Sequence, residues 1–165
     1  MSGSQGLLVI AQGSGCLPVQ SNDNVAAVRR AFPDFAALTV EKYGVSPARE
    51  ATDPDPEDCP LSYHAHSTVT QREEDYVRVV EILKKKKWWN GKLVLFGGSE
   101  GGSAMAGLSR RLKADAVILL STGGGATFGE MIKTLVPIEV RVDLDAFFDD
   151  VRQNPDSIDT KGVKF

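Results

Sequence analysis

The residue in this chain best suited to do chemistry is Ser99, in the segment Gly97-Gly98-Ser99-Glu100-Gly101. An apolar run of strand length ends here, and a helical pattern of small residues follows. This is the G-x-S-x-G pattern of a nucleophile elbow, in which a serine occupies a tight strand-to-helix turn. Glycines two residues either side of the serine remove side chains that would collide with neighbouring backbone. The pattern predicts a serine hydroxyl projecting above a sheet, with free helix N–H groups facing developing negative charge.

The alternative for this segment is a glycine-rich turn that only packs closely or binds an anion. A dinucleotide fingerprint fits less well, because G-x-G-x-x-G does not occur in the chain. A phosphate-binding P-loop is excluded, because no G-K-[ST] follows the glycines. Ser99 is therefore our candidate nucleophile.

The elements around this segment alternate between strand and helix patterns. Buried strands are predicted at 7–11, 35–40, 92–96 and 116–120, and helices at 22–31, 70–83, 104–112, 128–135 and 143–153. Asn22 or Asn24 is expected to cap the first helix, and Thr70 with Glu73 the second. The pattern predicts an α/β fold with a three-layer parallel sheet of about four strands flanked by helices. We expect a single domain over 1–165, with 126–165 as a helical segment after the fourth strand.

A second glycine-rich motif, Gln12-Gly13-Ser14-Gly15, follows the first strand. With the Ser99 motif, it makes residues 7–125 resemble a partial α/β-hydrolase fold. The resemblance is to serine esterases of dienelactone-hydrolase-like or prolyl-peptidase-like type, with Gln12 in place of the usual histidine. It implies that Ser99 attacks a small-molecule ester, thioester or amide without a cofactor. The oxyanion donors implied are the backbone N–H of Ser14 or Gly15, and that of Glu100.

The resemblance breaks at the acid and base of the triad. In the family an Asp or Glu and then a His follow the serine, but no histidine follows Ser99 here. Aspartates do follow it, in a helical pattern, at Asp143, Asp145, Asp149 and Asp150. Three explanations stay open: a fragment whose missing C-terminal half carries the acid and base, a base supplied by His64 or His66, or a non-catalytic binding module. We favour the first.

The remaining candidate groups lie upstream of Ser99. His64 and His66 stand near the end of a long Pro- and Asp-rich loop expected over 44–69, and no further ligands suggest a metal site. Cys16 and Cys59 either form one disulfide or remain two free thiols. Glu100 is either an exposed turn residue or a partner for a cationic group of the substrate.

Composition narrows the function classes. The chain has 165 residues, 42% of them hydrophobic, and a net charge of −3, which gives no electrostatic case for nucleic-acid binding. No apolar run approaches the roughly 20 residues of a membrane span. The compartment stays open between the cytoplasm and a periplasmic or secreted location. We also predict self-association through the edge left after the fourth strand, unless the later helices cover it.

Overall fold

The apolar run near the start of the chain forms β1 (Gln5–Ala11), a central strand of a four-stranded sheet. The strand order is β2-β1-β3-β4, with β2 at Phe35–Leu38, β3 at Trp89–Gly98 and β4 at Ala116–Leu120. All three strand pairs are parallel. Every residue of β1 after Gln5 is buried, as expected of a strand covered on both faces. The predicted fold class, a parallel sheet flanked by helices, is confirmed.

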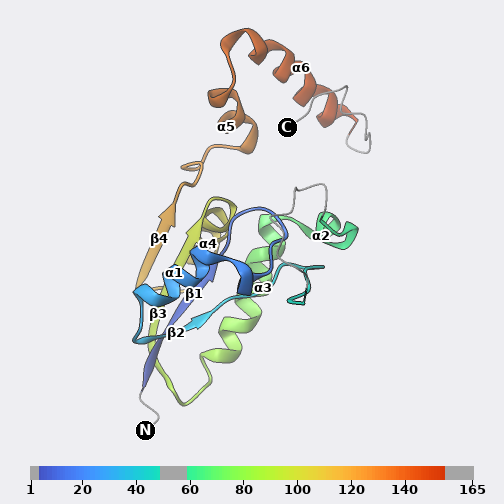
Figure 1. Cartoon of the computed structure of the whole chain (residues 1–165). Helices are drawn as coiled ribbons and strands as arrows, with labels where there is room; N and C mark the ends of the chain where they lie inside the picture. The colour runs from blue at the N-terminus through green and yellow to red at the C-terminus, as the bar shows by residue number, and fades with distance from the viewer. Residues whose placement is uncertain (1–3, 49–58, 155–165) are drawn as a thin grey trace. The chain divides into compact units, whose positions relative to one another are not determined.

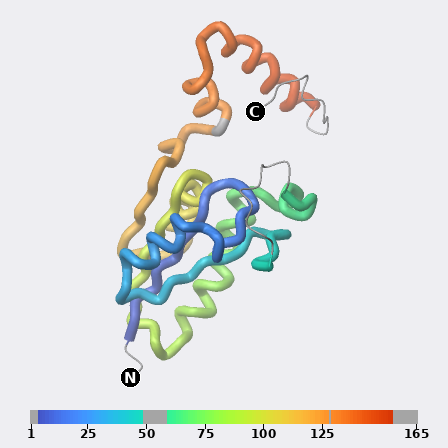
Figure 2. Tube along the Cα trace, in the orientation of Figure 1, coloured from blue at the N-terminus to red at the C-terminus, as the bar shows by residue number. Residues whose placement is uncertain are grey.

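The computed structural model describes residues 4–48 and 59–154. The chain divides into two compact units, Met1–Thr122 and Gly123–Phe165. The sheet and the Ser99 segment belong to the first unit, and two helices make up the described part of the second. Figure 2 traces the chain through the first unit from β1 to β4.

Helices cover both faces of the sheet (Figure 1). On one face α3 (Val69–Leu83) and α4 (Glu100–Arg111) pack Tyr76 and Met105 against Leu7 and Leu95. On the other face α1 (Asp23–Ala31) packs Val25 against Leu8 and its neighbours. The two sets separate because successive side chains of a strand point to opposite faces.

The residue that caps α1 is one expected from the sequence, whereas the residue that caps α3 is not. Asn22 caps α1, its side chain accepting a hydrogen bond from the Val25 N–H at 3.2 Å. The expected cap Thr70 is wrong: α3 begins earlier, and the Thr68 hydroxyl accepts from the Gln71 N–H at 3.1 Å. Both threonines have a glutamine or glutamate three residues later, so local spacing alone does not choose between them.

The expected long loop over 44–69 is shorter in the structure. A helical turn, α2 (Leu61–His66), lies inside it and carries both histidines. A 3-10 turn, η1 (Val19–Ser21), also precedes α1. The most Pro- and Asp-rich part of the expected loop lies outside the described residues.

The second unit contains α5 (Phe128–Leu135) and α6 (Ile138–Gln153). Thr127 caps α5 in a capping box with Glu130. The last helix begins at Ile138 rather than near Asp143, and its N-cap residue is Pro137, with φ −55° and ψ 150°. Two helices thus follow the fourth strand, and residues 155–165 of the expected helical segment lie outside the described residues.

Two properties of the described residues concern contact with a membrane and with other chains. None of the helices in the described residues is both long and apolar enough to cross a membrane. The edge strand β4 exposes apolar side chains at Val117, Leu119 and Leu120. Self-association through this edge stays a prediction.

Candidate active site

Ser99 occupies the turn between β3 and α4 with φ 52° and ψ −127°. A positive φ is uncommon for a residue other than glycine and is held only when the surroundings require it. The Ser99 N–H donates to the Leu120 carbonyl at 2.9 Å, which ties the turn to the end of β4. The Ser99 side chain makes no capping hydrogen bond with α4 and is exposed. Its hydroxyl is thus presented outward from the carboxyl edge of the sheet.

The glycines of the motif allow this turn by backbone-to-backbone packing. A β-carbon on Gly97 would lie 2.5 Å from the Gly101 carbonyl carbon. One on Gly101 would lie 2.5 Å from the Gln12 carbonyl oxygen, in the loop after β1. Both distances are below any real contact of such atoms, so glycine is required at each position. The strand, the helix and the loop therefore meet directly around Ser99.

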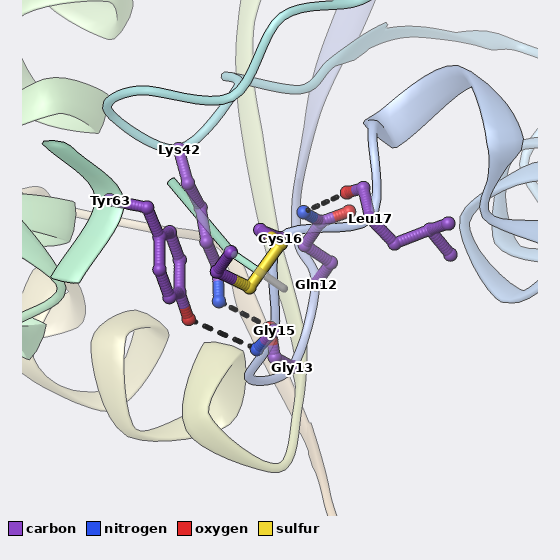
Figure 3. The surroundings of a disulfide bond; sticks show 8 residues. Gln12, Gly13, Gly15, Cys16, Leu17, Lys42 and Tyr63 are labelled. Carbon is purple, nitrogen blue, oxygen red and sulfur yellow. Dashed lines mark hydrogen bonds between the residues drawn. A yellow bond between two sulfur atoms is a disulfide. The ribbon is translucent and has the colours of Figure 1, made fainter. Parts of the chain in front are cut away.

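The loop after β1, which we call the glycine loop (Gln12–Pro18), is closed by its first residue. The buried Gln12 side chain donates from Nε2 to the Leu17 carbonyl at 2.9 Å (Figure 3). Its Oε1 accepts from Asn22 Nδ2 at 3.5 Å. The two side-chain hydrogen bonds of Gln12 thus hold the loop in shape.

The two N–H groups proposed from the glycine loop differ in the structure. Gly15, with φ 90°, donates its N–H to the Tyr63 hydroxyl at 3.1 Å (Figure 3). No hydrogen bond from the Ser14 N–H occurs within the residues described, and Ser14 is exposed. Of the two alternatives, Ser14 has the donor that is still available to a ligand.

Lys42 is a site residue that sequence reasoning missed. Its side chain is only 2% exposed, and Nζ donates to the Gly13 carbonyl at 2.7 Å and to Glu100 Oε1 at 3.0 Å. Figure 3 shows it between the glycine loop and Tyr63, whose ring centroid lies 5.5 Å from Nζ. Glu100 therefore already has an internal cation as its partner. In the sequence, Lys42 lies just beyond the predicted strand 35–40 and belongs to no motif.

Cys16 and Cys59 form a disulfide, with their Cα atoms 5.7 Å apart. Both are buried in a small cluster with Val45 and Tyr63. Because Cys59 lies just before α2, the bond brings Tyr63, within that helix, to the N–H of Gly15. The alternative of two free thiols does not describe this structure.

The two histidines are exposed on α2 and partner other rings. His66 lies against Tyr43 with ring centroids 3.9 Å apart, and His64 lies edge-on to Tyr63 at 5.3 Å. No contact between either histidine and Ser99 occurs in the described part of the chain. The structure therefore brings together Ser99, Glu100 and the glycine loop, but not a histidine base.

Four of the aspartates that follow Ser99 lie on α6, as their helical spacing predicts: Asp143, Asp145, Asp149 and Asp150. Asp145 pairs with Lys133 of α5, and Asp149 pairs with Arg152. Neither pairing resembles the placement of a triad acid after a strand. The catalytic acid is therefore not identified among these residues.

A cavity of about 420 Å³ lies beside Ser99 on the α1 side of the sheet. Its apolar wall includes Val25, Val28 and Phe96, and its polar groups include Asn22 and Ser121. Such an apolar hollow with few polar groups is typical of a small-ligand site. A larger hollow of about 590 Å³ lies at the far end of α1, around Phe32 and Pro33, away from the strand ends where parallel sheets bind ligands.

No group of three or more potential metal ligands occurs among residues 4–48 and 59–154. Neither protein-family models nor curated proteins match the chain. The assignment of function consequently depends on the geometry around Ser99.

Proposed function

We propose that this chain belongs to a serine hydrolase of α/β-hydrolase type that acts on an ester, thioester or amide. The observation that carries the proposal is the backbone of Ser99, with φ 52° on a strand-to-helix turn beside a cavity. A strained serine whose hydroxyl makes no cap is a feature that close packing alone does not require.

In the proposed reaction, Ser99 Oγ attacks the substrate carbonyl carbon while its proton passes to a base. The carbonyl oxygen becomes an oxyanion that accepts hydrogen bonds from the N–H groups of Ser14 and Glu100. The bond to the leaving group then breaks, and the leaving group departs protonated. Water hydrolyses the acyl-serine ester, which releases the acid and restores Ser99.

The proposed reaction also needs a base that takes the proton of Ser99. Ser99 has no histidine after it in the sequence, and His64 and His66 make no described contact with it. The base therefore comes from outside these residues or from movement of α2. In serine proteases that have lost a member of the triad, the oxyanion hole and substrate binding alone keep a rate advantage of about 10³–10⁴ over water.

The test is covalent labelling by a fluorophosphonate, which transfers a phosphonyl group to the serine oxygen and releases fluoride. We expect slow but selective labelling at Ser99, located by peptide mass mapping and lost in Ser99→Ala. Ser103→Ala is the matched control, since Ser103 is an exposed serine one turn along α4. Labelling of Ser99 no faster than that of Ser103 would contradict the proposal.

The alternative is a binding module on a hydrolase-like fold. It is favoured by the same absence of contact between Ser99 and a histidine in the described residues. Such a module would bind a small ester in the cavity beside Ser99 without labelling or turnover, and its affinity would survive Ser99→Ala.

A further inference from the structure

We propose that Lys42 is a positioning residue that orients the Ser14 N–H and neutralises Glu100 at the oxyanion site. The inference rests on the proposed function, because it concerns how the same site stabilises negative charge. It arises from a juxtaposition that only the tertiary structure creates. Lys42 and Glu100 are 58 residues apart in the sequence, yet their charged atoms lie 3.0 Å apart.

The burial of Lys42 makes its contacts specific. A buried ammonium is costly unless it is paired and hydrogen-bonded. Lys42 satisfies that condition with one carbonyl, at 2.7 Å, and one carboxylate, at 3.0 Å. The carbonyl belongs to Gly13, which precedes the proposed donor N–H of Ser14. The carboxylate belongs to Glu100, whose own N–H is the other proposed donor.

The carbonyl partner fixes the orientation of a peptide plane. The Gly13 carbonyl and the Ser14 N–H belong to the same peptide unit, which is planar and trans. In a trans peptide the C=O and N–H point in opposite directions, so the bond from Lys42 directs the Ser14 N–H away from Lys42. A cationic donor on the carbonyl also polarises the unit, which strengthens the N–H as a donor.

The carboxylate partner of Lys42, Glu100, places a negative charge next to the oxyanion site. Glu100 follows Ser99 directly, and its own N–H is the other proposed donor. An uncompensated carboxylate next to a developing oxyanion would repel it. The Lys42 ammonium offsets that charge, so the site can hold a second negative charge nearby.

This role differs from that of a general base. Lys42 Nζ donates to two acceptors, and no contact with Ser99 occurs among the described residues. Lys42 would therefore affect the reaction through the Gly13–Ser14 peptide and through Glu100.

The experiment uses phenylboronic acid, whose boron bonds to a serine oxygen. The product is a tetrahedral boronate anion with release of one proton, and it mimics the charged intermediate. Boron-11 NMR reports tetrahedral boron on the whole chain, with Ser99→Ala as the background. We expect Lys42→Met to weaken this complex by about 10-fold or more, in line with the loss of an oxyanion donor. Lys42→Arg should recover part of the affinity, because it keeps a positive charge beside Glu100.

A second measurement in the wild-type chain does not depend on whether Lys42→Met folds. On boronate formation, the amide proton resonances of Ser14 and Glu100 should move downfield. That of Gly15, which is bonded to Tyr63, should move least and serves as the internal control. A shift at Gly15 in place of Ser14 would overturn the assigned peptide orientation.

The outcomes separate the two proposals. If the wild type forms no tetrahedral boronate on Ser99, the proposed function fails and the role of Lys42 fails with it. If the boronate forms and a folded Lys42→Met binds it as tightly as the wild type, the role of Lys42 is overturned while Ser99 stands as nucleophile. Equal weakening in Lys42→Met and Lys42→Arg would also contradict a role that depends on charge.

Discussion

A β-carbon on Gly13 would lie 3.3 Å from the β-carbon of Ser99, so the glycine loop lies directly against the candidate nucleophile. That spacing is tighter than most real contacts, and Ser99 would have to shift by a few tenths of an ångström. We expect Gly13→Ala to slow fluorophosphonate labelling of Ser99 by about 10-fold, because small misplacements of a nucleophile are costly. The free energy of unfolding should fall by only about 1 kcal/mol, since Ser99 is exposed and can yield. Labelling at the wild-type rate would show that the loop does not constrain Ser99.

Adjacent glycines at the end of β3 should respond differently to the same substitution. A methyl group on Gly97 would overlap the backbone of Gly101, whereas one on Gly98 would meet nothing nearer than the Leu120 carbonyl at 3.9 Å. We expect Gly97→Ala to destabilise the protein by about 3 kcal/mol or more, and Gly98→Ala by less than about 1 kcal/mol. Denaturant unfolding of the two variants measures the difference. Similar stability of both would contradict the close packing of β3 on α4.

The Cys16–Cys59 disulfide should contribute to stability and to the shape of the glycine loop. It joins residues separated by 43 positions, and a bond of this kind typically contributes about 2–4 kcal/mol. We expect reduction to lower the unfolding free energy by that amount and to increase hydrogen exchange at the Gly15 N–H. The Cys16→Ser/Cys59→Ser double variant should have the stability of the reduced protein, and adding a reductant should not change it. Two titratable thiols in the native oxidised chain would contradict the bond.

Glu41 should make stability depend on pH in the acidic range. Burial raises the pKa of the Glu41 carboxyl above its ordinary 4.5, while the Val19 N–H and the charge of Arg72 oppose the rise. Because the folded-state pKa exceeds the unfolded one, the folded state binds more protons in this window. The stabilising contribution is therefore full below pH 4.5 and is lost as the pH rises through the folded pKa.

Glu41→Gln cannot ionise and provides the comparison for this effect. The wild type should lose stability relative to Glu41→Gln as the pH rises from 4.5, measured by denaturant unfolding across a pH series. The amide oxygen of the variant still accepts from the Val19 N–H, which contacts both Glu41 oxygens at 3.0 and 3.1 Å. A stability of the wild type relative to Glu41→Gln that is flat with pH, or that rises as the pH rises, would contradict the raised pKa.

The edge strand β4 should govern self-association. Val117 and Leu119 point to one face of the strand and are each 40% exposed. An apolar edge with unpaired backbone groups favours pairing with another chain. We expect concentration-dependent association by sedimentation velocity, reduced in Leu119→Lys. Ile138→Lys, at an exposed apolar position on α6, is the control and should leave association unchanged.

Local rules account for much of what the sequence predicted. The four strands, the turn at Ser99 and the Asn22 cap each depend on spacing over a few residues, and the structure contains them. Where two local solutions compete, as at Thr68 and Thr70, the sequence favoured the wrong one. The start of α6 was missed because the apolar positions before Leu144 did not fit one buried face; Ile138 and Val142 are exposed.

The chemistry of the site needed tertiary structure. The sequence by itself determined a serine on a glycine-flanked turn, because the constraint lies within five residues. The disulfide, the Tyr63 hydroxyl on Gly15 and the buried Lys42 on Glu100 join positions 43, 48 and 58 residues apart. They meet because the sheet order β2-β1-β3-β4 brings the carboxyl ends of parallel strands, and the loops that follow them, to one edge. Spacing along a chain does not specify that order, so only the folded structure decides which loop side chains surround Ser99.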